Sequence, residues 1–392
     1  MPTKYTTRRS LQDRASAFNN FIPSELRSIM KIFWENGKNV YIVGGAVRDF
    51  LLGFPVKDFD IATNAHPKEM EKFLNEKGVK TKPIGSKYGT ILAIIGKNAV
   101  FDICTFRQEI HTELGPPEVI FVNSLEEDLP RRDFRFNAIA FDPKNHQFID
   151  IFNGYADIQK CTVQMIGNAF TRLSEDGTRI IRLARFISQF PKLRIHPDLL
   201  AATNVIGKTA KFHNYTTLKK EFFKLLMLSD PRKGLCLLWE TQTLDALFPH
   251  FPLLSFDCDK SEIIFTKFKE ILSHDKWIRF FGLLLLLSKE PIQTKRLLIQ
   301  LGQDWKITTK EQNRLDHLLH SLISFPQTAE TKKIKRWIRS TGINTSEDLL
   351  QLLFLYPELL GDSNLLLNKR SYFKKAQTIL ESFRQTSKKN LK

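Results

Sequence analysis

The feature that most constrains the fold is a pair of glycines directly after a short apolar segment. The residues run Val43-Gly44-Gly45-Ala46-Val47-Arg48-Asp49, so a buried strand over 39–43 is expected to lead into a helix over 46–52. Glycine lets the backbone approach a ligand closely, and the first turn of a helix presents free N–H groups and the positive end of its dipole. The pattern therefore predicts a phosphate-binding turn at Gly44 and Gly45.

A second strand, which carries two acids, follows shortly afterwards. Positions i and i+2 of a strand share one face, so Asp58 and Asp60 in Lys57-Asp58-Phe59-Asp60-Ile61 are expected to point the same way. Two parallel carboxylates repel one another unless a cation lies between them, and Mg²⁺ binds one or two carboxylates together with phosphate oxygens. Either half alone has a plain alternative, a Gly-Gly turn or a surface strand bearing acids. In this order, the two halves favour a site for nucleoside triphosphates and Mg²⁺.

Residues 41–67 resemble the signature of the class II nucleotidyltransferases, which comprise the CCA-adding tRNA nucleotidyltransferases and the bacterial poly(A) polymerases. Further matches follow in the family's order through the first half of the chain: Gly89-Thr90, residues 102–107, residues 128–134, Asn137-Ala138, Asp150 with Gly154 and Asp157, and residues 175–186. A chance match of so many spaced elements is improbable. The resemblance implies an α+β chain, with an N-terminal mixed α/β nucleotidyltransferase head followed by an α-helical neck, body and tail.

The distribution of strand and helix signals predicts five parts. These are a basic, loose arm with one N-terminal helix (1–37, the helix starting at Pro23), the head (38–152), a helical neck (153–215), a helical body (216–300) and a helical basic tail (301–392). Helices are expected over 176–190, 217–228, 234–247 and 259–272, and the apolar run 280–287 is expected to be a core helix.

The charge balance indicates a polyanionic partner. The chain carries a formal net charge of +17, which suits RNA or a membrane surface. No run approaches the ~20 apolar residues needed to span a bilayer, and no apolar stretch follows Arg8-Arg9 as a secretory signal would require. The cysteines at 104, 161, 236 and 258 have neither metal-ligand spacing nor a disulfide pattern. We therefore expect RNA as the partner and a cytoplasmic location.

A third carboxylate, Asp102, lies in the apolar segment 100–106. An unpaired carboxylate would be costly to bury in such a strand, so something must neutralise it. The resemblance implies that Asp102 stands on the strand beside the two metal-binding aspartates and orients the 3′-hydroxyl of the RNA primer. The alternative is an ion pair with Arg107 or Arg48.

The segment 131–137 carries two arginines, an acid and an amide. Arg131, Arg132 and Asp133, with Asn137 one helical turn beyond, are expected to place an arginine fork, an acceptor and an amide near the ribose and triphosphate. The plainer alternative is a helix start in which Asp133 caps free N–H groups and both arginines are solvated. The order of the motifs favours a nucleotide contact for Asp133 and leaves the individual arginine roles open. Arg48, in the helix expected after the first strand, is a further candidate nucleotide contact.

The segment 174–179 is a candidate for base selection. Cytosine and adenine present an amino donor beside a ring-nitrogen acceptor, whereas uracil and guanine reverse this order. Asp176 and Arg179, three residues apart on one helical face, would therefore accept C and A and reject U and G. The alternative is an ordinary helix start, with Ser174 as the N-cap and an i,i+3 ion pair. Arg182 and Arg185 continue the same stripe and are expected to face the triphosphate or the RNA.

The C-terminal part contains a predicted basic helix around Trp337. Five cations are candidates for contacting RNA phosphates: Lys332, Lys333, Lys335, Arg336 and Arg339. A solvated face over a core tryptophan is an equally good interpretation.

Four local differences from the family pattern bear on the activity. The loop Glu113-Leu114-Gly115-Pro116-Pro117 lacks the arginine that CCA-adding relatives commonly carry. Gly177-Thr178 and Thr216-Thr217 replace helix-favouring residues and a Glu-Arg pair, respectively. Leu286-Leu287 stands where some longer relatives have the His-Asp pair of a phosphohydrolase, so no second hydrolase centre is expected.

Together these features predict an Mg²⁺-dependent enzyme that extends RNA 3′ ends with CMP and AMP from CTP and ATP, and most simply rebuilds the CCA terminus of tRNA. A poly(A) polymerase would use ATP only, but residues 85–90 resemble the CCA-adding type. An RNA-binding protein without catalysis is suggested by the differences in the loop and neck, and is opposed by the intact Asp58 and Asp60.

Overall fold

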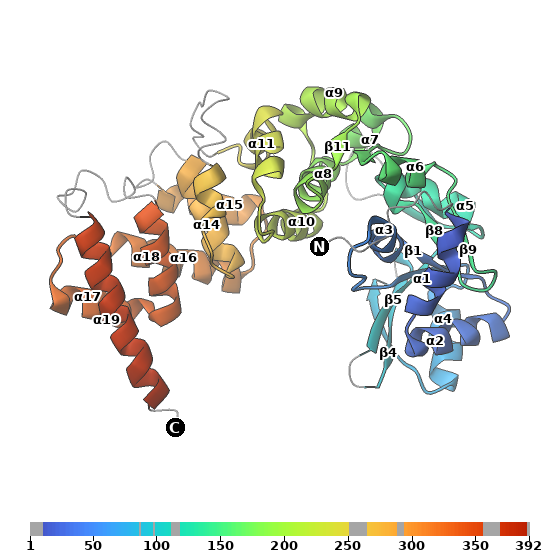
Figure 1. The fold of residues 1–392 in the computed structure, drawn as a ribbon, viewed down its shortest axis with the longest axis horizontal. Helices are drawn as coiled ribbons and strands as arrows, with labels where there is room; N and C mark the ends of the chain where they lie inside the picture. The colour runs from blue at the N-terminus through green and yellow to red at the C-terminus, as the bar shows by residue number, and fades with distance from the viewer. Residues whose placement is uncertain are drawn as a thin grey trace. The chain divides into compact units, whose positions relative to one another are not determined.

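The computed structural model describes residues 11–85, 88–96, 99–110, 118–250, 265–287, 294–355 and 369–389. The chain divides into unit 1, Met1–Asp176 with Lys192–Thr203, and unit 2, Gly177–Pro191 with Asn204–Lys392; Figure 1 labels their elements. The five-part division drawn from the sequence stays a prediction.

Among the described helices, none is both long and apolar enough to cross a membrane. Cys104 and Cys161 are free thiols, whereas Cys258 lies outside the described residues.

Unit 1 is built on a seven-stranded mixed sheet with the order β3-β4-β5-β2-β1-β8-β9. Its strands are β1 (Val40–Val43), β2 (Asp60–Thr63), β3 (Lys80–Gly85), β4 (Thr90–Ile95), β5 (Ala99–Thr105), β8 (Ala140–Asp142) and β9 (Gln147–Ile149). In this sheet β2 and β5 pair in parallel, and the other neighbours pair antiparallel. The mixed α/β head expected from the sequence is confirmed.

Two smaller strand pairs flank the sheet. The antiparallel hairpin joins β6 (Arg107–Ile110) to β7 (Glu118–Phe121), and β10 (Thr162–Val163) pairs in parallel with β11 (Arg194–Ile195). The loop 113–117 and Ser86-Lys87, which the sequence analysis singled out, lie outside the described residues.

Helices cover the sheet of unit 1, and α2 and α4 lie side by side in Figure 1. The helices are α1 (Ala15–Phe21), α2 (Ser24–Glu35), α3 (Gly45–Leu52), α4 (Pro67–Glu76), α5 (Leu125–Asp128), α6 (Gly154–Gln159) and α7 (Ala169–Glu175), while α9 (Pro197–Ile206) begins in unit 1 and ends in unit 2. The expectation of a loose arm through residue 21 is wrong for residues 11–21. Phe18 of α1 is fully buried, and its ring lies 4.9 Å from that of Phe50 and 4.8 Å from that of Phe141.

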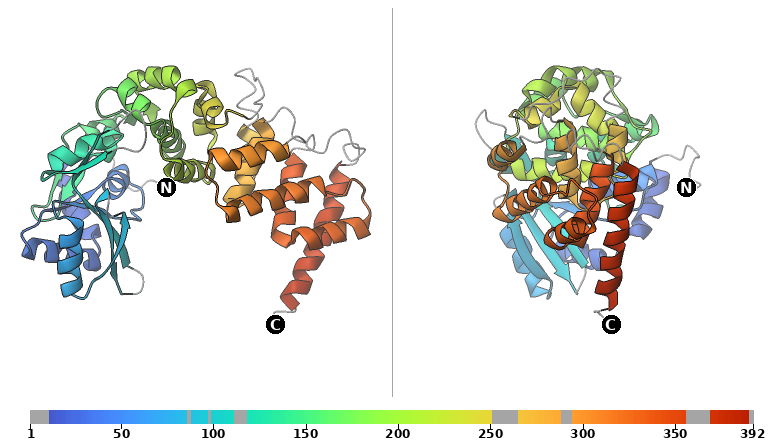
Figure 2. Two further views of the ribbon diagram at one scale, coloured as in Figure 1. Left: turned by 180° about the vertical axis from the view of Figure 1, so that it is seen from behind. Right: turned by 90° about the vertical axis from the view of Figure 1, so that its left-hand side faces the viewer.

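Every described secondary-structure element of unit 2 is helical, and the orange and red part of Figure 2 shows its C-terminal helices. The α-helices are α8 (Thr178–Gln189), α10 (Tyr215–Leu226), α11 (Arg232–Glu240), α12 (Thr243–Leu247), α14 (Lys276–Leu287), α15 (Thr294–Asp304), α16 (Thr309–Ile323), α17 (Thr331–Thr341), α18 (Ile343–Leu355) and α19 (Lys369–Lys389). The helix expected over 234–247 is divided into α11 and α12, because Gln242 adopts a left-handed conformation with φ of 55°. Of the helix expected over 259–272, residues 259–264 lie outside the described residues, and residues 265–269 are helical.

The helix expected over 176–190 also has a break at its start. α7 ends at Glu175, Asp176 is extended with φ −153° and ψ 105°, and α8 begins at Thr178. Ser174 therefore lies in the last turn of α7 and is not an N-cap. The N–H of Gly177 donates to the Lys211 carbonyl at 2.8 Å, and a Cβ at Gly177 would lie 2.9 Å from that oxygen. The glycine that replaces a helix-favouring residue thus permits close packing against residues 210–212.

Candidate active site

The three predicted carboxylates lie near the start of β2. Asp60 is the first residue of β2, and its register partner on β5 is Asp102. Asp58 lies before the strand, so the prediction that both acids stand on β2 is wrong for Asp58. Desolvation raises the pKa of the Asp60 carboxyl; Arg132 and Arg48 oppose this shift, and the carboxylates of Asp102 and Asp58 add to it. The three acids therefore repel one another in the protein alone.

Asp102 is exposed to solvent, contrary to the argument that its strand would bury it. β5 alternates, so Phe101 and Ile103 are buried on one face while Asp102 projects from the other. Of its two alternative ion-pair partners, Arg48 pairs with Asp49 at 2.7 Å and Arg107 pairs with Glu109 at 2.9 Å. The position of Asp102 beside Asp60 agrees with the placement that the sequence motifs implied.

The Gly-Gly turn lies next to these carboxylates. Gly44 has φ of 71° and precedes α3, which begins one residue earlier than expected, at Gly45. A Cβ at Gly44 would lie 3.2 Å from Nη1 of Arg132 and 3.6 Å from Oδ2 of Asp60. Glycine at position 44 therefore allows the positive φ. Its lack of a side chain also leaves room for the Arg132 guanidinium group and the Asp60 carboxylate.

A chain of buried polar contacts runs from α3 to the segment 133–137. Arg48 donates to Oδ1 of Asn137 at 2.8 Å, and Nδ2 of Asn137 donates to Oδ1 of Asp133 at 2.9 Å. Asp133 also accepts the N–H of Phe134 at 2.8 Å. Residues 135–137 form one 3-10 turn without a side-chain cap, so the alternative in which Asp133 caps a helix is not what the structure has. The side chains of Arg48, Asn137 and Asp133 thus form one network, although Arg48 lies far from the other two in the sequence.

The two neighbouring arginines have different surroundings. Arg131 pairs with Asp128 at 2.9 Å and with Glu109 at 3.3 Å, and these carboxylates outweigh burial and raise the pKa of Arg131. Arg132 approaches Asp128 only at 3.4 Å, and burial lowers the pKa of Arg132 despite Asp128 and Asp60. The side chains are only 15% and 16% exposed, so the alternative of two solvated arginines is wrong. Arg131 is bound to protein carboxylates, whereas Arg132 faces Gly44 and Asp60.

Asp128, Glu109 and Arg172 are residues whose contacts the sequence analysis missed. Asp128 is completely buried, accepts the backbone N–H of Arg107 at 3.0 Å, and pairs with both arginines. The burial of an acid three residues before a basic pair could have been suspected from that spacing, but the approach of Glu109 depends on the β6–β7 hairpin. Arg172 on α7 donates to three consecutive backbone carbonyls at 130–132.

The predicted base-selecting residues lie on either side of the helix break. Asp176 is the last residue of the first segment of unit 1, and Arg179, which is buried, belongs to the first turn of α8 in unit 2. They do not share one helix, so the expected placement on one helical face is wrong. Base selection by Asp176 and Arg179 stays a prediction.

The other two arginines of the predicted stripe lie on α8 beside Glu221 of α10. Arg185 donates from Nε to Glu221 at 2.7 Å and from Nη1 to Gln189 at 3.0 Å. Arg182 is also close enough that its charge lowers the pKa of Glu221. These contacts give Arg185 a role within unit 2, and its predicted contact with triphosphate or RNA remains untested.

Comparison with known proteins agrees with this geometry. A family model described as the Poly A polymerase head domain matches residues 40–164. The CCA-adding enzyme of Streptococcus mutans serotype c is 33% identical over 312 residues, which cover 76% of this chain and 72% of that protein. The chain belongs to the CCA-adding enzyme family.

Solved structures from this family have the same fold as the present member. The CCA-adding enzyme of Bacillus stearothermophilus in complex with CTP superposes with a TM-score of 0.67 at 26% identity, covering 92% of this chain and 83% of that one. A tRNA nucleotidyltransferase complexed with a primer tRNA and an incoming ATP analogue gives a TM-score of 0.63 at 22% identity. The match covers 92% of this chain and 99% of that one. The likeness therefore extends over most of this CCA-adding family member.

The basic helix predicted around Trp337 is α17. All five of its candidate cations are exposed, while Ile334, Trp337 and Ile338 are buried. Trp337 donates from Nε1 to the Ser321 carbonyl at 2.7 Å, so the tryptophan is a core residue. The helix therefore presents a cationic face to solvent, as both interpretations of the sequence require.

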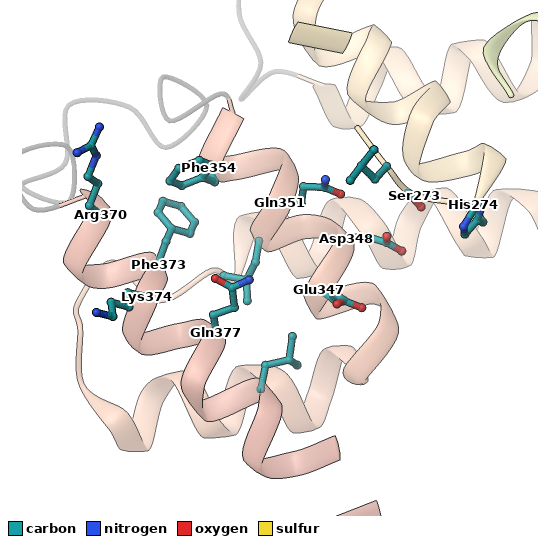
Figure 3. Close-up of a pocket in the computed structure, with 13 residues that line it drawn as sticks. Ser273, His274, Glu347, Asp348, Gln351, Phe354, Arg370, Phe373, Lys374 and Gln377 are labelled. Carbon is teal, nitrogen blue, oxygen red and sulfur yellow. The ribbon is translucent and has the colours of Figure 1, made fainter. Parts of the chain in front are cut away.

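A pocket of about 630 Å³ lies in unit 2 of this family member, between α18, α19 and the segment before α14 (Figure 3). Acids on α18 and cations on α19 line it, including Asp348, Arg370 and Lys374. Burial raises the pKa of Asp348. None of the residues predicted to be catalytic or nucleotide-binding lines this pocket.

No group of three His, Cys, Asp or Glu side chains is preassembled as a metal cage anywhere in the described part of the chain. Asp275, beside His274, accepts the Trp277 N–H at 2.8 Å and pairs with Arg314. An acid pair that completes its coordination with phosphate oxygens needs no such cage.

Proposed function

We propose that this member of the CCA-adding family adds CMP and AMP, from CTP and ATP, to RNA 3′ ends and rebuilds the CCA terminus of tRNA. The observation that carries the proposal is the convergence of the Gly44 turn, Asp60 and Arg132 at one point of the head. The CCA-adding enzyme of Streptococcus mutans, at 33% identity, and the structure of the Bacillus stearothermophilus enzyme with CTP support the same activity.

In this proposal the triphosphate binds at the start of α3. The N–H groups of the first turn and the guanidinium of Arg132 supply positive charge on one side of the phosphates. The network of Arg48, Asn137 and Asp133 is buried next to that turn and is proposed to hold the ribose. Arg131 contributes indirectly, because its pairs with Asp128 and Glu109 hold the same segment.

Asp58 and Asp60 are the residues proposed to hold Mg²⁺. They fit such an ion because desolvation and the two carboxylates of Asp102 and Asp58 raise the pKa of Asp60, and a divalent cation would offset that repulsion. When bound, Mg²⁺ would neutralise triphosphate charge and favour the alkoxide form of the attacking hydroxyl.

The proposed chemistry is an in-line displacement. The oxygen of the RNA 3′-hydroxyl forms a bond to the α-phosphorus, and the bond between the α-phosphorus and the bridging oxygen breaks, which releases pyrophosphate. Asp102 projects from β5 next to Asp60 and is proposed to accept the hydrogen bond of the hydroxyl and orient it.

Selection of the base is proposed to rest on Asp176 and Arg179, and tRNA binding on the cationic face of α17, with its five exposed lysines and arginines. Arg182 and Arg185 are further candidates for triphosphate or RNA contact. The proposed compartment is the cytoplasm.

The activity is tested on a tRNA transcript that lacks CCA, offered CTP and ATP separately and together, with sequencing of the 3′ ends. We expect CC with CTP alone and CCA with both nucleotides. Addition of AMP only, whatever the mixture, would instead identify a poly(A) polymerase. An unextended transcript that still binds would identify an RNA-binding protein without catalysis.

The carboxylate assignment is tested in the same assay. Asp58→Ala and Asp60→Ala are expected to abolish incorporation and to leave tRNA affinity within a few fold, because phosphate contacts elsewhere dominate that affinity. Glu76→Ala, which removes an exposed acid at the end of α4, is the matched control. Normal turnover by Asp58→Ala would refute the assignment.

A further inference from the structure

Arg172, on α7, contacts the turn that carries the two arginines of the site. From one nitrogen, Nη2, it donates to the carbonyls of Arg131 at 2.8 Å, Arg132 at 3.1 Å and Pro130 at 3.5 Å. Its other terminal nitrogen pairs with Glu175 at 2.8 Å. The Arg172 guanidinium group therefore donates to three consecutive backbone carbonyls of a segment that lies 40–42 residues earlier in the chain.

The same turn is also held through its side chains. Asp128 binds the guanidinium groups of Arg131 and Arg132, but its distance to Arg132 is 3.4 Å and that to Arg131 is 2.9 Å. Arg132 thus has the weaker side-chain anchor, although it is the arginine that faces Gly44 and Asp60. Its place at the site must depend on its backbone, which Arg172 contacts directly.

α7 itself is firmly attached to the head. Asn168 caps its first turn by accepting the Thr171 N–H at 3.0 Å, and Leu173 is fully buried. Just before α7, Ile166 donates its N–H to the Asp133 carbonyl at 3.0 Å, and Arg135 donates to the Gln164 carbonyl at 3.0 Å. α7 ends at Glu175, next to Asp176, so Arg172 lies between the turn that carries Arg132 and the carboxylate predicted to read the base.

We propose that Arg172 is a positioning residue that fixes the turn 130–132 against the end of α7, so that Arg132 and Asp176 meet one nucleotide in a constant geometry. The inference rests on the proposed function for the identity of the nucleotide. Lysine at position 172 would keep the charge opposite Glu175, but its single ammonium group lacks the planar fork that spans Glu175 and the carbonyls together.

The test measures equilibrium binding of CTP, ATP and UTP to the full-length Arg172→Lys protein, together with its melting temperature. We expect affinity for CTP and ATP to fall at least ~10-fold and the preference over UTP to shrink, because small displacements of positioned groups have large effects. In incorporation assays the same variant is expected to show raised KM values for CTP and ATP.

The matched control is Arg27→Lys, in the same unit. Arg27 on α2 likewise donates to a backbone carbonyl, that of Asn19, and to the Asn19 side chain, but none of the site residues lies on α2. It is expected to lower the melting temperature without changing nucleotide affinity or selectivity. If Arg172→Lys lost its cooperative thermal transition, Arg172→Gln, whose amide still donates to one carbonyl, would be measured instead.

Equal nucleotide affinities in parent and Arg172→Lys, with only a lower melting temperature, would overturn the positioning role. Failure of the proposed function is a separate result, since it appears as absence of CMP and AMP incorporation by the unaltered protein. Nucleotide binding by Arg172→Lys can be compared with the parent in either case.

Discussion

Asp60 and Asp102 are register partners across the parallel pair of β2 and β5, and both side chains are exposed on the same region of the sheet. Neighbouring strands lie about 4.8 Å apart, so the two carboxylates share one small volume. Asp60 belongs to the predicted metal pair, whereas Asp102 is the residue proposed to orient the RNA hydroxyl.

We therefore expect Asp102→Asn to reduce the rate of incorporation by ~100-fold or more, which is the usual contribution of a group that positions or accepts a proton. CTP affinity should change little, because the triphosphate is proposed to bind at α3 and Arg132. Single-turnover rates and equilibrium CTP binding separate the two effects. Glu76→Gln, at an exposed acid, is the control, and a full rate for Asp102→Asn would remove Asp102 from the reaction.

The different contacts of Arg131 and Arg132 give a prediction in which a variant of each residue is the control for the other. Arg132→Lys is expected to raise KM for CTP and ATP by ~10-fold or more, because a hydrogen bond to a charged group contributes roughly 1.5–3 kcal/mol. Arg131→Lys should mainly lower the melting temperature, since Arg131 is bound to Asp128 and Glu109. The opposite pattern in steady-state kinetics and thermal unfolding would reverse the assignment.

The parts of the site predicted correctly from sequence are those whose signals are local. The glycine pair after an apolar run predicts the turn between β1 and α3 within one residue, and the order of motifs predicts Asp102 beside Asp60. The spacing also predicts Asn137 one helical turn beyond Asp133; the turn is a short 3-10 turn, and the two side chains form a hydrogen bond.

Two of the wrong predictions depend on residues distant in the sequence, and one depends on alternation within a single strand. The break at Gly177 follows from packing against residues 210–212, which no pattern within 174–190 shows. The exposure of Asp102 follows from the alternation of β5, which an apolar run concealed. Similarly, Arg131 differs from Arg132 because the β6–β7 hairpin brings Glu109 to only one of them.

The ion pair of Glu221 with Arg185 predicts a pH dependence of stability. Desolvation raises the pKa of Glu221, but Arg185, Arg182 and Lys224 outweigh it, so the pKa is lowered on folding. A lowered carboxyl pKa stabilises the fold above the unfolded value of about 4.3, and this contribution is lost as pH falls through the folded value. The free energy of unfolding of Glu221→Gln at pH 7 should therefore be lower than that of the parent by about 1–3 kcal/mol.

The difference in free energy of unfolding between the parent and Glu221→Gln should narrow as pH falls below about 4.3. Denaturant unfolding at several pH values measures it. Glu240→Gln, at an exposed position on α11, should leave the stability of the parent unchanged throughout. If the difference in free energy of unfolding between the parent and Glu221→Gln stays constant with pH, the ion pair is not the cause of that difference.

Base selection by the protein is tested at Arg179. If Asp176 and Arg179 read the edge shared by C and A, Arg179→Ala should weaken the use of CTP and ATP and relax discrimination against UTP. A bidentate contact contributes ~1–3 kcal/mol of discrimination, well above assay error. Arg179 is buried, so the variant is also expected to unfold at a lower temperature. Incorporation of all four nucleotides is therefore measured beside thermal stability, and a destabilised but equally selective variant would contradict the assignment.

The cationic face of α17 predicts how tRNA affinity responds to salt. Replacement of Lys332, Lys333 and Arg336 by glutamine removes three exposed charges. If they contact phosphates, the slope of log affinity against log salt should fall by roughly 2 units, since each contact contributes about 0.7–0.9. The control removes three exposed lysines of unit 1, at positions 68, 72 and 80, and so changes net charge equally. Equal slopes in both triple variants would mean that α17 acts only through overall charge, whereas a smaller slope confined to the α17 variant places RNA phosphates on this helix.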